Sequence, residues 1–117
     1  MEIQYSELQN NIKLVKLSGK LDMGGVGEIE TRFTGYCGGE NPRVLVDLSN
    51  VNFLSSIGIR LLAVNAKSVA RRGGRMFLLN PIPDVRSVLD VTGIPVIIPI
   101  HDALESAEAA FVSQIES

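Results

Sequence analysis

Apolar residues follow two different spacings along the chain, and the changes from one spacing to the other divide it into strands and helices. Alternating or continuous apolar runs predict strands at residues 3–8, 12–17, 44–48, 51–54, 75–80 and 96–100. Apolar residues that recur every three or four positions predict helices at 23–36, 56–71, a segment around 85–89 that stops at Gly93, and a last helix that begins at Asp102.

The order of these elements predicts an α/β fold. The first two strands are separated by a short Gln9-Asn10-Asn11 turn and should pair antiparallel, whereas later strands alternate with helices and should pair parallel. Residues 44–48 are continuously apolar, as expected of a strand buried on both faces. We therefore expect one domain over residues 1–117, with a mostly parallel mixed sheet of four or five strands, an antiparallel edge and about four helices.

Two predicted helices begin with a polar residue that can cap them. Asp22 precedes the first helix, and Ser55 and Ser56 lie where a strand passes into the second. Capping alone explains these residues, but a phosphate on Ser56 would also meet the free N–H groups and the dipole of the first turn. Arg60 is four residues further on and could reach such a phosphate. Because carboxyl ends of parallel strands share an edge, Asp22 and Ser56 are expected to be neighbours.

Composition argues against several classes of protein. The net charge of −2 gives no basic excess for nucleic acid, and the apolar run 94–100, which contains two prolines, is too short to cross a membrane. A single cysteine, Cys37, and a single histidine, His101, provide neither a disulfide nor a zinc cluster. No signal peptide, catalytic triad or nucleotide-binding loop is readable, so we expect a cytoplasmic protein that is not an enzyme and holds no metal or cofactor.

The segment Phe53-Leu54-Ser55-Ser56-Ile57-Gly58-Ile59 resembles the signature of the STAS domain family, in particular the bacterial anti-sigma factor antagonists. Gly19-Lys20-Leu21-Asp22 and residues 80–94 also resemble that family. Ser56 matches the serine that a partner kinase phosphorylates. Ser55 stands where the family has Asp, and Ile57 stands where it has a second hydroxyl residue.

This resemblance implies a STAS-like fold and a phosphorylation-controlled partner switch. The expected partners are an anti-sigma factor that is also a serine kinase and a metal-dependent serine phosphatase, and the protein itself should be a monomer or weak dimer. Ser56 is the expected phosphoacceptor with Ser55 as its fallback, and the expected partner contacts are Asp22, Ser55, Ser56, Ile57, Gly58 and Arg60.

Other functions remain open from the sequence. Without the family's Asp and second hydroxyl, the protein could be a scaffold that is never phosphorylated, within a signalling or transport assembly. An enzyme or small-ligand site around Asp22 and Ser56 is a third hypothesis. The basic side chains Arg60, Lys67 and Arg71 form either a solvated helix face or the border of a partner's footprint.

Overall fold

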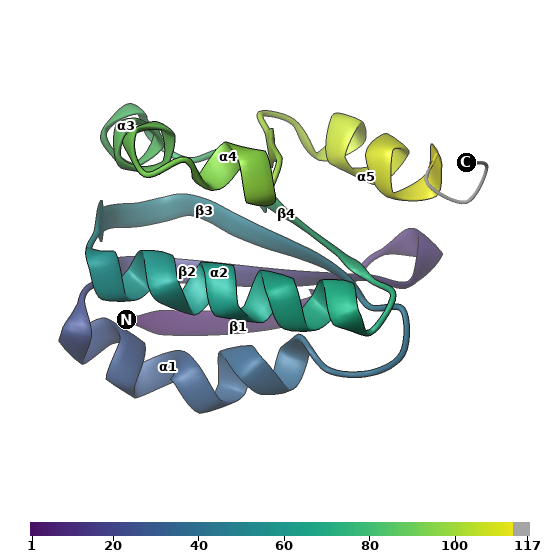
Figure 1. Ribbon diagram of the computed structural model, residues 1–117, viewed down its shortest axis with the longest axis horizontal. Helices are drawn as coiled ribbons and strands as arrows, with labels where there is room; N and C mark the ends of the chain where they lie inside the picture. The colour runs from purple at the N-terminus through teal and green to yellow at the C-terminus, as the bar shows by residue number, and fades with distance from the viewer. Residues whose placement is uncertain (114–117) are drawn as a thin grey trace.

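A five-stranded sheet in the order β1-β2-β3-β4-β5 forms the centre of the protein. The structure is a computed structural model that describes residues 1–113. β1 pairs antiparallel with β2, and all other neighbours are parallel, which confirms the predicted mixed sheet (Figure 1). The strands are β1 Glu2–Glu7, β2 Ile12–Leu21, β3 Arg43–Leu54, β4 Arg75–Leu79 and β5 Ile100–His101.

The helices cover the two faces of this sheet unequally. They are α1 Met23–Tyr36, α2 Ser56–Arg71, α3 Pro83–Val91, α4 Ile94–Ile97 and α5 Leu104–Ser113, with a 3-10 turn at Gln9–Asn11 between β1 and β2. Buried side chains of α1 to α4 share one core with alternate residues of β2, β3 and β4. Phe111 and Ala107 of α5 pack on the opposite face, against Leu45 and Phe77.

The main error of the sequence prediction is the strand expected at residues 96–100. Residues Ile94–Ile97 instead form the single turn α4, so residues 1–113 contain five α-helices where about four were expected, and β5 consists only of Ile100 and His101. Pro95 and Pro99 have no N–H to donate to a neighbouring strand, whereas a proline in the first turn of a helix loses no hydrogen bond.

A second difference concerns the length of β2 and β3. The polar pair Ser49 and Asn50 was expected to interrupt the central strand, but β3 continues through it to Leu54. The Asp47 carboxylate accepts a hydrogen bond from the Ser49 N–H at 2.9 Å, and the register with β2 shifts at two places nearby. β3 therefore accommodates its polar residues through irregular pairing with β2, and the two strands end side by side at Leu21 and Leu54.

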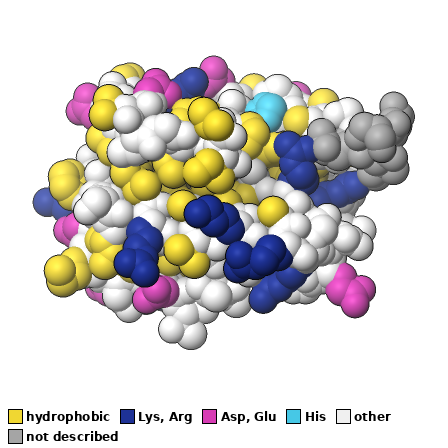
Figure 2. Space-filling view, in the orientation of Figure 1, with side chains coloured by type: hydrophobic (Ala, Val, Ile, Leu, Met, Phe, Trp, Pro, Cys, Tyr) yellow, Lys and Arg dark blue, Asp and Glu magenta, His cyan; other side chains and the backbone are white. Residues whose placement is uncertain are grey.

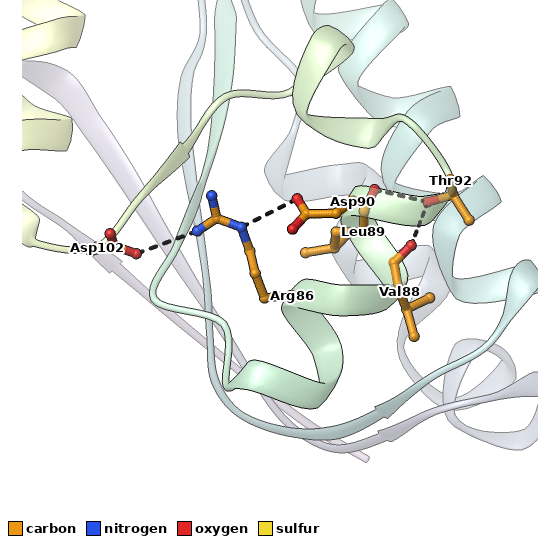
Figure 3. A network of polar contacts seen from close by, with 6 residues as sticks. All are labelled: Arg86, Val88, Leu89, Asp90, Thr92 and Asp102. Carbon is orange, nitrogen blue, oxygen red and sulfur yellow. Dashed lines mark hydrogen bonds and ion pairs between the residues drawn. The ribbon is translucent and has the colours of Figure 1, made fainter.

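Arg86 connects α3 to the segment that leads into α5 (Figure 3). Its Nε lies 3.4 Å from Asp90 Oδ1 and its Nη1 lies 3.5 Å from Asp102 Oδ1. The hydroxyl of Thr92 donates to the carbonyl oxygens of Val88 and Leu89 and closes the C-terminal end of α3. Because the charged groups are largely exposed, this network orients the segment and adds little to stability.

Among residues 1–113, no helix has both the length and the apolar character needed to cross a membrane.

Candidate functional site at the carboxyl edge of the sheet

α1 and α2 begin side by side at the carboxyl edge of the sheet. The register between β2 and β3 places Leu21 opposite Leu54, and each is followed directly by the residue that caps a helix, Asp22 and Ser55. The expected neighbourhood of the two helix starts is therefore present.

The two helix starts have the same local geometry. Asp22 Oδ1 accepts a hydrogen bond from the Gly25 N–H at 2.8 Å, and Ser55 Oγ accepts one from the Gly58 N–H at 3.4 Å. A Cβ at Gly25 would collide with the Lys20 carbonyl oxygen, and a Cβ at Gly58 would lie 2.6 Å from the Leu21 carbonyl oxygen. Glycine at the third helical position thus lets each helix start close against the strand ends. The Asp22 cap is confirmed.

The two adjacent serines differ in what they bind. Ser55 Oγ donates to the Leu21 carbonyl oxygen at 2.8 Å, and the Ser55 N–H reaches the same oxygen at 3.1 Å. Ser56 is the first residue of α2 and is exposed. Within residues 1–113, its hydroxyl makes no hydrogen bond, and the N–H groups of Ser56 and Ile57 have no acceptor. Ser55 is therefore engaged in the fold, whereas Ser56 presents an exposed hydroxyl with no hydrogen bond in the described chain.

Exposed apolar side chains surround the free serine. Met23 is 76% exposed, Phe53 49% and Ile57 37%, and all three lie within two residues of a helix cap. The sequence prediction included Ile57 but missed Met23 and Phe53, because it assigned Met23 to a helix and Phe53 to an apolar strand. The feature of the sequence that could have identified Met23 and Phe53 is their position next to the capping residues Asp22 and Ser55.

Gly58 and Arg60 take different places in this region. Gly58 is buried beneath the surface, so it shapes the site through packing and offers no face to a partner. Arg60 is exposed and borders a groove between α1 and α2 with a volume of about 490 Å³. The groove begins at Ile57, next to Ser56, and ends at Arg71.

The other candidate reactive groups lie elsewhere. Cys37 follows the far end of α1, where burial raises the pKa of its thiol to about 12. The ring of His101 lies 4.8 Å from that of Phe77, and its Nδ1 is 3.3 Å from Ser106 Oγ. Across the described chain, no three His, Cys, Asp or Glu side chains gather as metal ligands would. The structure therefore does not bring these groups together with the site.

Comparison with known proteins identifies the family. A family model of the STAS domain matches residues 5–107. The chain belongs to the STAS domain family. Among curated relatives of this STAS domain, a Bordetella bronchiseptica protein named anti-sigma factor antagonist BtrV is 28% identical over 95 residues, which are 81% of this chain and 82% of the relative. An anti-sigma F factor antagonist of Paenibacillus polymyxa is 26% identical over 82% of this chain and 83% of its own.

Solved structures share the fold of this STAS domain. A Thermotoga maritima protein described as an anti-sigma factor antagonist superposes with a TM-score of 0.84 at 21% identity, over 93% of both chains. The antagonist SpoIIAA of Bacillus matches in its unphosphorylated form (TM-score 0.75, 22% identity, 93% of this chain and 96% of that one) and in its phosphorylated form (TM-score 0.69). The STAS domain of a SulP transporter from Vibrio cholerae matches with a TM-score of 0.70 at 23% identity, over 95% of this chain and 88% of that one.

Proposed function

We propose that this protein is an anti-sigma factor antagonist whose partner binding is controlled by phosphorylation of Ser56. In the unmodified state it binds an anti-sigma factor that is also a serine kinase, and so releases a sigma factor. It acts as a substrate and binding module rather than as an enzyme. The observation that carries the proposal is the division between the two serines, of which only Ser56 presents a free hydroxyl.

Chemistry at the helix start supports a phosphate at this position. The N–H groups of Ser56 and Ile57 are available as donors, and the positive end of the α2 dipole favours added negative charge. Arg60, one turn further along α2, can add a charge-assisted hydrogen bond. We propose that the structure accepts phosphoserine without rearrangement of the fold.

The same phosphate would disrupt an apolar docking surface. Met23, Phe53 and Ile57 flank Ser56 and would be desolvated when a partner binds. A phosphoserine carries about −1.5 to −2 charges at neutral pH, so its burial in that contact is unfavourable. Phosphorylation should therefore release the partner, and a metal-dependent serine phosphatase would restore binding.

Ser55 in place of the family's Asp is compatible with this proposal. Asp and Ser are both good N-caps, and Ser55 performs that role through the Gly58 N–H. The replacement removes a negative charge beside the acceptor but leaves the helix start intact. We therefore expect phosphorylation to persist.

Intact-mass spectrometry after incubation with the partner kinase and ATP tests the proposal. Wild type should gain one phosphate, Ser56→Ala none, and the phosphorylated protein should lose affinity for the kinase. Ser87→Ala, which removes an exposed hydroxyl from α3 outside the site, is the control and should be phosphorylated like wild type. If Ser56→Ala still gained a phosphate, the acceptor would be a different residue, and Ser55 would be the first to test.

A scaffold role is the second candidate, favoured by the structural match to a transporter's STAS domain and by the missing acid at position 55. In that case the kinase would bind wild type without transferring phosphate. Binding without a mass change in the same experiment would support the scaffold and contradict the switch.

A further inference from the structure

The groove between α1 and α2 combines features that point to a second docking site. α1 contributes Val26, Glu30 and Thr34, which are spaced one turn apart. The α2 side is formed by residues that repeat at helical spacing, namely Ile57, Arg60, Leu61, Val64, Asn65, Ser68 and Arg71. The groove therefore follows almost the whole of α2, a length of about 20 Å at 1.5 Å per residue.

Apolar side chains in the groove are incompletely covered. Val64 is 52% exposed and Ile57 is 37% exposed, although both are β-branched residues that usually pack inside a protein. Figure 2 shows apolar side chains interleaved with Lys and Arg side chains along the surface that α2 forms. The surface along α2 is therefore a mixture of apolar and positively charged side chains.

Arg60 and Arg71 share the groove with a single acidic lining residue, Glu30, and neither arginine forms an ion pair in the described chain. The ion pairs found there involve the N-terminus and Arg86, and none involves Arg60 or Arg71. These two arginines are eleven residues apart in α2, which corresponds to about 16 Å along the helix axis. A single small anion cannot bridge that distance, whereas a linear segment with two separated carboxylates can.

Asn65 provides an independent indication of a ligand. It is the buried polar residue of the described core, with 4% of its surface exposed, and it lines the groove. Its Nδ2 donates to the Leu61 carbonyl oxygen at 2.9 Å, but its Oδ1 accepts no hydrogen bond from any of residues 1–113. Since no fully buried side-chain N or O atom is left without a partner in the described chain, Oδ1 keeps accessible surface, and Asn65 lines the groove.

The backbone chemistry of the groove favours a helix as its occupant. Both walls are α-helices, whose backbone groups are already paired within each helix, so an extended peptide would find no ladder partners. A helical segment satisfies its own backbone and binds through side chains alone. A second copy of this chain is a less suitable occupant. In a two-fold contact the same surface of both copies would meet, so Arg60 and Arg71 of one copy would face and repel the arginines of the other.

We propose that the α1–α2 groove binds an acidic amphipathic helix of a partner protein. Its apolar side contacts Ile57, Leu61 and Val64, its carboxylates pair with Arg60 and Arg71, and a polar donor reaches Asn65 Oδ1. The proposal rests on the proposed function only in taking that partner to be the anti-sigma protein. The groove itself requires no phosphorylation.

The test uses a synthetic peptide of about 18 residues, long enough as a helix to span the groove. It carries leucines on one side and two glutamates about 11 residues apart, and the control peptide carries glutamines at those positions. Titration into isotope-labelled protein should give saturable NMR shifts at Val64, Asn65 and Ser68. Arg60→Glu with Arg71→Glu should weaken binding about tenfold or more.

Arg32→Glu is the matched control, since Arg32 is an exposed arginine of α1 outside the groove. It should change affinity by less than about twofold, because exposed charges away from a contact contribute little. No kinase or ATP is present in this titration, so failure of the phosphorylation switch would leave this result unchanged.

Three outcomes would overturn the proposal. They are the absence of saturable shifts at millimolar peptide, equal binding of the glutamine peptide, and equal weakening by Arg32→Glu. Shifts in the same residues that depend on protein concentration without peptide would assign the groove to a second copy instead.

Discussion

At the residue scale, the adjacent serines Ser55 and Ser56 differ in what they contribute to the fold. Ser55 holds α2 against Leu21 with its hydroxyl, whereas the Ser56 hydroxyl makes no hydrogen bond within residues 1–113. The sequence placed both residues at the helix start but could not say which one caps it. That assignment depends on the Leu21 carbonyl oxygen, which is supplied by a strand 34 residues earlier.

Replacement of each serine by alanine should therefore have unequal effects on stability. Ser55→Ala removes the cap and leaves the Leu21 carbonyl with one donor fewer, so the free energy of unfolding should fall by about 1–2 kcal/mol. Ser56→Ala should change it by less than about 0.5 kcal/mol. Urea denaturation followed by circular dichroism measures both values. Equal losses would mean that Ser56 also supports the fold.

Gly58 gives a second prediction at this scale. A Cβ there would lie 2.6 Å from the Leu21 carbonyl oxygen and 2.9 Å from Leu54 Cδ1, so Gly58→Ala should destabilise the protein by about 1–3 kcal/mol. Gly27→Ala is the control, because a Cβ at Gly27 meets nothing within 4 Å and alanine favours the helix by about 1 kcal/mol. Thermal unfolding should show opposite shifts. A gain in both variants would contradict the close approach of α2 to β2.

At the scale of elements, the apolar pattern predicted most of the fold because each strand and helix buries one regular set of side chains. β3 illustrates this, since Val44, Val46 and Leu48 face α1 to α3 while Leu45 faces α5. The pattern failed at 96–100, where apolar residues are compatible with a strand or a helix and the prolines decide. It also did not indicate the groove, which exists only once α1 and α2 lie side by side.

α5 is the element whose loss should expose a face of the sheet. Its Ala107 and Phe111 belong to the same core cluster as Leu45, Phe77 and Leu79, and the Phe111 ring lies 4.3 Å from that of Phe77. Phe111→Ala should lower the free energy of unfolding by about 3–5 kcal/mol and remove hydrogen-exchange protection from α5. Val112→Ala, at a neighbouring exposed position, is the control and should have little effect. A loss below about 1 kcal/mol for Phe111→Ala would show that α5 is not held by this contact.

At the scale of the whole molecule, the buried thiol of Cys37 reports on global unfolding. Burial raises its pKa to about 12 from 9.0, despite the nearby charges of Lys13 and Arg72. The folded protein should therefore resist iodoacetamide at pH 8, whereas the unfolded protein should react rapidly. Alkylation followed by mass spectrometry, with and without guanidinium, checks this. Rapid modification of the folded protein would contradict the burial.

The same shift makes stability depend on pH. Because the folded pKa lies above the unfolded one, this thiol contributes its full stability below pH 9 and loses it as the pH rises toward 12. Cys37→Ser should reduce that dependence. Urea denaturation of wild type and Cys37→Ser at pH 8 and at pH 10.5 measures the free energy of unfolding below and above 9.0, the ordinary pKa of the thiol. An unchanged slope in the variant would assign the alkaline loss to other groups.

The free hydroxyl of Ser56 also has a consequence for how such a protein can change over evolutionary time. Under the proposed switch, a single codon change at position 56 would remove the phosphate acceptor and another would restore it, because the Ser56 hydroxyl makes no hydrogen bond within residues 1–113. Position 55 lacks this freedom, because its hydroxyl is shared between α2 and β2. Under the proposed switch, phosphorylation could therefore be lost and regained during evolution without a change of fold.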